Sequence, residues 1–160
     1  MRIDHIGSTS VPRLPAKDII DVQVTVDALD MEELRPRFLE AGYTHRSDIH
    51  LYDHKPPGVQ GPDEDWAKLL FTPSPGQRAA HVHLRLSGRP NQRYALLFRD
   101  YLRTHATAAA AYAELKRRLA ELGIDRFVYA DTKDPACDLI IVAAEDWAIQ
   151  SSWQPGPADA

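Results

Sequence analysis

The chain has 160 residues and a formal net charge of −4, with 44% of its residues hydrophobic and 26% charged. This composition is typical of one soluble globular domain, and a domain of this length buries roughly two-thirds of its unfolded surface. The longest apolar run, Leu139–Ala144, is too short for a membrane span, which needs about 20 apolar residues. The acidic balance argues against non-specific binding of nucleic acid. The single cysteine, Cys137, excludes an intrachain disulfide and favours a cytoplasmic location.

The first predicted element is a short strand that ends at Gly7. The residues that follow, Ser8, Thr9 and Ser10, carry hydroxyl groups, and a turn here leaves backbone N–H groups free to hold an anion such as phosphate. Lys17 adds a positive charge near the same anion. We therefore expect a phosphate-binding loop at this point of the chain.

A second predicted strand, residues 19–26, has two different faces. Side chains alternate along a strand, so valines occupy one face, while the other carries Asp21, Gln23 and Thr25. Asp21 follows the expected phosphate loop by about 14 residues, a spacing that suits a metal–nucleotide site. Asp21 is therefore the first candidate for a metal ligand and a catalytic residue.

Residues 31–41 have the pattern of a helix. Asp30 begins a capping-box pattern, and Gly42 is typical of the position just past a helix end. Pro36 is expected to bend or shorten this helix. Residues 43–66 have the pattern of a short strand and an irregular loop, the kind of segment that often borders a site.

Two further strands are predicted at Lys68–Thr72 and Ala80–Leu86. The second of them places His81 and His83 on its polar face. Neighbouring strands share a core on their apolar faces, so their polar faces point the same way. We therefore expect Asp21, His81 and His83 to converge on one cleft.

The rest of the chain is predicted to be helical. Asn91 is the expected N-cap of one helix, and a second helix covers about Thr107–Leu122, with apolar residues at helical spacing. The pair Asp134-Pro135 is the expected cap and first residue of a last helix, which reaches about Gln150.

Several segments, taken together, resemble the GrpB-like family, small proteins of nucleotidyltransferase fold. They are HIGSTSVP-x-LPAK-x-IID from His5 to Asp21, His81-x-His83, the run Leu97–Leu102, Tyr112 with Leu115-Lys116, and Tyr129 with Lys133. The resemblance is strongest to the accessory domain that follows dephospho-coenzyme A kinase in actinobacteria, which implies a link to coenzyme A biosynthesis. Family members usually carry a helical segment before the first of these motifs, so the start is either truncated or the domain was cut from a longer protein.

The resemblance implies an α/β fold of the nucleotidyltransferase type, with a mixed sheet flanked by helices and a helical C-terminal half. Residues 1–153 are expected to form this single domain. Residues 154–160 include proline and glycine but no core residue, so we expect a disordered tail.

The resemblance also implies a set of residues that bind a phosphorylated or nucleotide-like ligand. They are Gly7, Ser8, Thr9, Ser10, Lys17, Gln23, Arg99, Lys116, Tyr129 and Lys133. In the nucleotidyltransferase pattern, carboxylates two residues apart on one strand hold Mg²⁺, but this chain has Gln23 at the second position. A neutral amide supplies neither charge nor a base. We therefore predict negligible nucleotidyl transfer with Mg²⁺ and ATP, while phosphorylated ligands still bind.

The site leaves three functions open. Asp21, His81 and His83 form a possible set of ligands for a divalent metal, Mg²⁺, Mn²⁺ or Zn²⁺, and nitrogen ligands favour zinc or manganese over magnesium. The two histidines are otherwise ordinary solvent-facing residues. The first function is a transferase-like protein that uses Asp21 and His83 as catalytic residues. The second is a non-catalytic accessory domain that assists dephospho-coenzyme A kinase, and the third is a metal enzyme of another chemistry.

Overall fold

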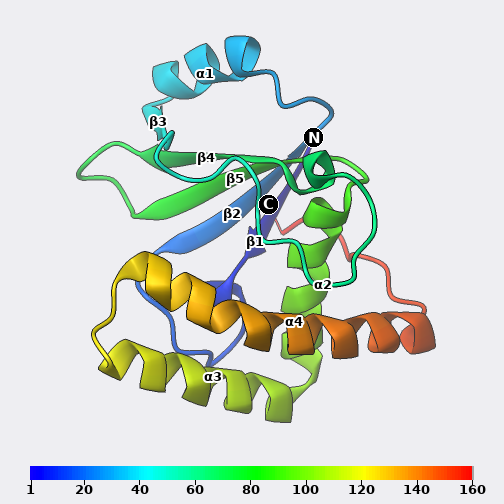
Figure 1. The fold of residues 1–160 in the computed structure, drawn as a ribbon. Helices are drawn as coiled ribbons and strands as arrows, with labels where there is room; N and C mark the ends of the chain where they lie inside the picture. The colour runs from blue at the N-terminus through cyan, green and yellow to red at the C-terminus, as the bar shows by residue number, and fades with distance from the viewer. Residues whose placement is uncertain (160) are drawn as a thin grey trace.

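The computed structural model describes residues 1–159 (Figure 1). In chain order the strands are β1 (Arg2–Ile6), β2 (Ile20–Val26), β3 (Tyr43–His45), β4 (Lys68–Pro73) and β5 (Ala80–Leu86). The helices are α1 (Met31–Glu40), α2 (Pro90–Thr104), α3 (Ala106–Glu121) and α4 (Arg126–Ser151). Short 3₁₀ turns lie at Ser8–Ser10 and Asp63–Trp66. The predicted strands and the first three predicted helices agree with these bounds to within about two residues.

The described strands form one mixed sheet in the order β1-β2-β5-β4-β3. The neighbouring strands β2 and β5 are parallel, and every other neighbouring pair is antiparallel. The parallel register places Asp21 beside His81 and Gln23 beside His83. Because side chains alternate along each strand, these four residues lie on the same face of the sheet.

The opposite face of the sheet is apolar and carries one core. Its buried residues are Val24, Leu69, Phe71, Val82 and Leu84. The apolar side of α1 covers this core, with the ring of Phe38 stacked on Phe71 at 4.2 Å between centroids. The expected split of β2 into an apolar and a polar face is therefore correct, and the apolar face is the one that α1 covers.

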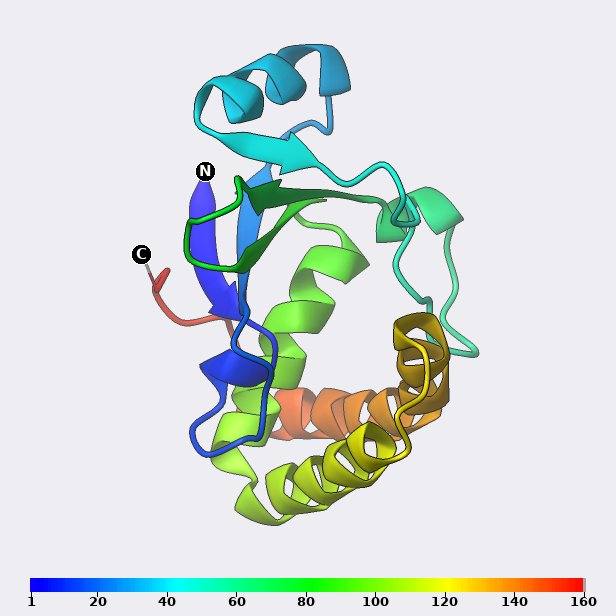
Figure 2. The same ribbon diagram turned by 90° about the vertical axis from the view of Figure 1, so that its left-hand side faces the viewer.

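The other three helices lie on the side of the sheet that carries Asp21. Figures 1 and 2 both place α1 above the sheet and α3 and α4 below it. The helix α2 runs between the sheet and these two helices, and it packs against β1, β5, α3 and α4. Among the residues that the structure describes, no helix is long and apolar enough to cross a membrane.

Two predicted helix starts are wrong. Asn91 is not an N-cap, because α2 begins one residue earlier at Pro90, a residue favoured in the first helical turn. Asn91 is instead buried, and its side-chain amide donates to the carbonyl oxygen of Trp66 at 2.8 Å. This bond fastens the start of α2 to the loop before β4.

The last helix begins at Arg126 and not at Asp134-Pro135. The carboxylate of Asp125 accepts a hydrogen bond from the backbone N–H of Phe127 at 2.8 Å and so caps the helix. Pro135 therefore lies inside α4, although it lacks the N–H of a helical hydrogen bond.

The disordered tail stays a prediction, and residue 160 lies outside the described residues. The carboxylate of Asp159 accepts a hydrogen bond from the backbone N–H of His5 at 3.1 Å.

Candidate metal and phosphate site

Asp21, His81 and His83 come together at one side of the polar sheet face. Asp21 Oδ1 lies 3.1 Å from His81 Nδ1 and 3.4 Å from His83 Nε2. One possible ligand atom from each residue lies within 4.8 Å of the other two, and this is the only such group found in residues 1–159. The predicted convergence of the three side chains is therefore confirmed as geometry.

The protonation of these groups suits a cation site. Burial by itself would raise the pKa of Asp21, but the hydrogen bonds to His81 and His83 outweigh it and hold that pKa well below the usual carboxyl value. Burial lowers the pKa of His83, and the nearby charge of Arg85 acts in the same direction. The cluster at neutral pH therefore contains a carboxylate and a neutral imidazole at His83, the forms in which these side chains bind metal ions.

Gly7 lies directly against this carboxylate. Its φ of 68° and ψ of −167° fall in a region that only glycine occupies readily. A Cβ atom on Gly7 would come within 2.9 Å of the Asp21 Cβ and closer still to Oδ2. The glycine that ends β1 is therefore needed both for the backbone turn and for the space that Asp21 occupies.

The hydroxyl groups after Gly7 have different roles. The Ser10 hydroxyl is buried and donates to the Gly7 carbonyl oxygen at 2.6 Å, so it shapes the turn. Thr9 Oγ1 lies 2.8 Å from His5 Nε2. The Ser8 hydroxyl accepts a hydrogen bond from Lys116 Nζ at 2.6 Å. Of this loop, Ser8 and Thr9 line the cleft next to Asp21.

That cleft has a volume of about 680 Å³ and lies between the sheet and the helices α3 and α4. Asp21, His81 and His83 line one part of it, and the other part is lined by Lys17, Lys116, Tyr129 and Lys133. Lys17 Nζ lies 5.7 Å from the centre of the Tyr129 ring. Burial, and then the neighbouring charge of Lys133, lower the pKa of Lys116 to about 8. The cleft thus carries two lysines whose charges repel each other, and it also contains the Asp21, His81 and His83 cluster.

Gln23 lies on the same sheet face but is fully buried, and its amide is engaged at both ends. Its Oε1 accepts a hydrogen bond from Arg85 Nη1 at 2.8 Å, and its Nε2 donates to the Gln92 carbonyl oxygen at 3.1 Å. Arg85 also donates to Asp53 Oδ2 at 2.7 Å. The structure therefore gives Gln23 a partner in a buried polar network beside the Asp21 cluster.

Asp53 is a member of this network that the sequence reasoning missed. Burial would raise its pKa, but the charges of Arg85 and Lys68, with which it forms ion pairs, hold the pKa well below the usual carboxyl value. Asp53 lies in the loop before β4, where Tyr52 forms an isolated bridge with Ala67. A single bridge leaves no periodic pattern, so the only sequence signal was the position of Asp53 in a loop rich in polar residues.

Arg99 does not line this cleft, and its charge is already paired. It is only 3% exposed, and it donates to Asp100 at 2.7 Å, to the His5 carbonyl oxygen at 3.0 Å and to Asp159 at 2.5 Å. The structure thus brings together most of the predicted site residues, namely Ser8, Thr9, Lys17, Asp21, His81, His83, Lys116, Tyr129 and Lys133. Gly7 supports them, while Ser10, Gln23 and Arg99 are committed to internal hydrogen bonds.

A mixed sheet with α1 on one face and a polar site between the other face and three helices defines an α/β protein of nucleotidyltransferase-like fold. The family profile described as "GrpB protein" matches residues 1–142. The chain belongs to the GrpB family.

Named relatives agree with this assignment. A crystal structure described as "conserved protein GrpB from Enterococcus faecalis" superposes with a TM-score of 0.66 at 28% identity, covering 92% of this chain and 82% of that one. A dephospho-CoA kinase from Mycobacterium leprae is 35% identical over 96% of this chain but only 42% of its own length. The UPF0157 protein YqkA of Bacillus subtilis is 35% identical over 74% of this chain and 31% of its own length. The chain thus spans less than half of either relative, and in the actinobacterial kinases it corresponds to their C-terminal part.

Proposed function

We propose that this domain binds a phosphorylated small molecule together with a divalent metal ion. Asp21, His81 and His83 hold the metal, and Lys116 and Lys133 neutralise the phosphate. The observation that carries the proposal is the position of the metal-type cluster and the lysines in one cleft. A metal ion and two ammonium groups that line one cleft suit a phosphate bridging between them.

The spacing of the cluster supports a metal in particular. In a tetrahedral site with bonds of about 2.0–2.1 Å, neighbouring ligand atoms lie roughly 3.3–3.4 Å apart. The oxygen–nitrogen distances from Asp21 to the two histidines are 3.1 and 3.4 Å. Both distances from Asp21 therefore fit such a site. Two nitrogen donors with one carboxylate favour Zn²⁺ or Mn²⁺ over Mg²⁺.

The pH dependence of anion binding tests the role of the lysines. Sulfate is a suitable probe because its own charge does not change between pH 7 and 10. Lys116 has a pKa of about 8 and is charged below that value. A bound anion raises this pKa, so we expect sulfate affinity to be highest below pH 8 and to fall by up to about tenfold per pH unit above it.

Titration calorimetry on the whole chain measures this profile, and Lys116→Arg is the matched control. Arginine keeps its charge throughout, so the variant is expected to bind sulfate with an affinity that stays flat to pH 10. A wild-type profile that is flat across the same range would contradict the assignment of Lys116.

Conventional nucleotidyl transfer is expected to be negligible. Gln23 supplies no second carboxylate, and its amide oxygen is occupied by Arg85, a cation that opposes a second metal ion there. Pyrophosphate release from ATP with Mg²⁺, Mn²⁺ or Zn²⁺ should therefore not exceed that of Asp21→Ala, and Gln23→Asp tests whether a carboxylate restores it. Robust Mg²⁺-dependent turnover by the unmodified protein, lost in Asp21→Ala, would show an ordinary transferase.

A second function is favoured by the relatives. Several of these relatives are chains named dephospho-CoA kinase, and this domain aligns with about two-fifths of the length of each. An accessory role beside such a kinase, in coenzyme A biosynthesis, fits a site whose second carboxylate position is closed by Arg85. Co-purification with the kinase, and kinase activity measured with and without this domain, distinguish this role from an independent one. The cytoplasmic location stays a prediction.

A further inference from the structure

A second cavity meets the cleft at the metal-type cluster. It is a chamber of about 310 Å³ between the sheet and α2, α3 and α4. The residues that line both cavities are Ser8, Asp21, His83, Tyr112 and Lys133. A ligand bound at the cluster can therefore extend into the cleft and into the chamber.

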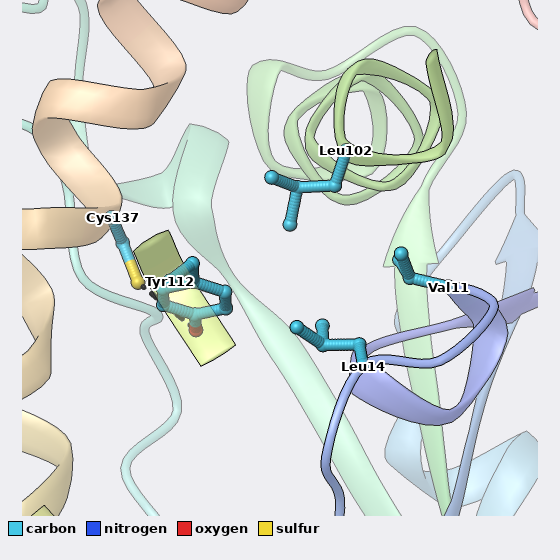
Figure 3. Packing of buried hydrophobic residues seen from close by; sticks show 5 residues of the cluster. All are labelled: Val11, Leu14, Leu102, Tyr112 and Cys137. Carbon is cyan, nitrogen blue, oxygen red and sulfur yellow. Dashed lines mark hydrogen bonds between the residues drawn. The ribbon is translucent and has the colours of Figure 1, made fainter. Parts of the chain in front are cut away.

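Part of the chamber wall is apolar. Figure 3 shows Val11, Leu14, Leu102, Tyr112 and Cys137, which form one cluster of buried residues, and all five line the chamber. Protein interiors are close-packed and have few voids larger than a water molecule. A space of about 310 Å³ is instead within the range of pockets for small molecules.

Aromatic rings form a continuous run along this chamber. The ring of Trp66 meets Tyr94 at 5.6 Å between centroids, Tyr94 is stacked with Phe98 at 6.0 Å, and Phe98 meets Tyr112 edge-on at 5.6 Å. All four residues line the chamber. Flat aromatic walls favour a flat ligand group, because stacked and edge-on ring pairs are stabilised beyond their buried area.

Two lining residues also have a ring nitrogen without a partner. Trp66 Nε1 and His83 Nδ1 are shielded from solvent and form no hydrogen bond with any described residue, and Trp66 is only 3% exposed. The indole nitrogen is only a donor, and because it has no accessible surface, an acceptor on a ligand reaches it only if the Trp66 ring turns toward the chamber. A planar group with ring nitrogens or carbonyl oxygens would satisfy it.

Charge differs between the two spaces. Lys17 and Lys116 line only the cleft and Lys133 lines both, whereas the carboxylates of Asp53 and Asp134 line only the chamber. The guanidinium groups that line the chamber, Arg85 and Arg99, are already paired with Asp53 and with Asp100 and Asp159. A phosphate is therefore favoured in the cleft, and the uncharged part of the same ligand is favoured in the chamber.

We propose that the ligand is a nucleotide-type molecule whose planar heterocycle occupies the chamber while its phosphates lie at the lysines of the cleft. This inference rests on the proposed function for the phosphate and the metal. It adds a recognition site for the heterocycle, formed by Trp66, Tyr94, Phe98 and Tyr112.

The test compares tripolyphosphate with the four ribonucleoside triphosphates, each in the presence of Mn²⁺. Titration calorimetry is expected to give at least tenfold tighter binding for at least one nucleotide than for tripolyphosphate. Ala95 lines the chamber from α2, and Ala95→Trp fills it. This variant should bind that nucleotide no better than tripolyphosphate and should bind tripolyphosphate as the wild type does. The matched control is Ala110→Trp, at an exposed position of α3 that lines neither cavity.

A milder substitution, Ala95→Leu, keeps the test valid if tryptophan prevents folding, and it should cause a smaller loss in the same direction. In the wild type, the NMR signal of the Trp66 indole N–H should shift with the nucleotide and not with tripolyphosphate. Equal affinity of tripolyphosphate and all four nucleotides would overturn the chamber assignment while leaving the proposed function intact. Binding of neither class of compound would instead refute the proposed function itself.

Discussion

Asp21→Asn is expected to weaken the binding of Zn²⁺ and Mn²⁺ more than about 100-fold. Loss of a group that only supports a metal ligand costs about 10–100-fold, and Asp21 is proposed to bind the metal directly. Asparagine has nearly the same shape but removes the charge that faces His81 and His83 at 3.1 and 3.4 Å. Metal content after purification without chelator, and competition with a chromophoric chelator, measure the effect.

Asp18→Asn is the matched control for this substitution. Asp18 is three residues earlier, and its exposed carboxylate forms an ion pair with Arg78. This variant should bind metal as the wild type does. If Asp21→Asn binds metal as well as the wild type does, Asp21, His81 and His83 form a hydrogen-bonded cluster that does not bind metal. That result would support the accessory role.

Gly7→Ala is expected to destabilise the fold by roughly 2–5 kcal/mol, because two costs add. The backbone at Gly7 has a conformation that is nearly exclusive to glycine. The new methyl group would also overlap the carboxylate of Asp21 and displace it from the histidines. Denaturant unfolding measures the loss of stability, and metal titration should show weaker binding.

Gly88→Ala separates these two costs. Gly88 has nearly the same φ, 71°, but a Cβ there would have no heavy atom within 4 Å. This variant is expected to lose only about 1 kcal/mol and to keep full metal affinity. Equal losses in the two variants would mean that contact with Asp21 does not constrain Gly7.

The metal-type cluster could be predicted from the sequence because it depends on strand alternation. Asp21 and the two histidines occupy alternate positions on strands with clear apolar faces, and pairing those faces fixes which side the polar groups share. The parallel register then places Asp21 directly beside His81. The turn at Gly7 was also predictable, because a glycine followed by hydroxylated residues is typical of a turn that ends a strand.

The buried network was not predictable in the same way. Asp53 comes from an irregular loop, Arg85 had only the position of a polar strand face, and Gln23 was predicted to bind the ligand. Their burial depends on α2 covering that part of the sheet. No local pattern in the sequence predicts this tertiary contact. The start of α4 was missed for a different reason. Asp134-Pro135 is itself a typical helix start, but the residue that caps α4 is Asp125, nine residues earlier.

The proposed site is divided between two layers of the protein, with the proposed metal ligands on β2 and β5 and lysines on α3 and α4. A ligand that bridges them acts as a tether between the layers, and any opening that moves the helices away from the sheet must first release it. By mass action, such opening becomes about 100-fold rarer when the ligand is at 100 times its Kd. The helix α1 lies on the other face and would not share this protection. Binding of the proposed ligand is thus expected to reduce the internal motions of one half of the domain and to leave the other half as it was.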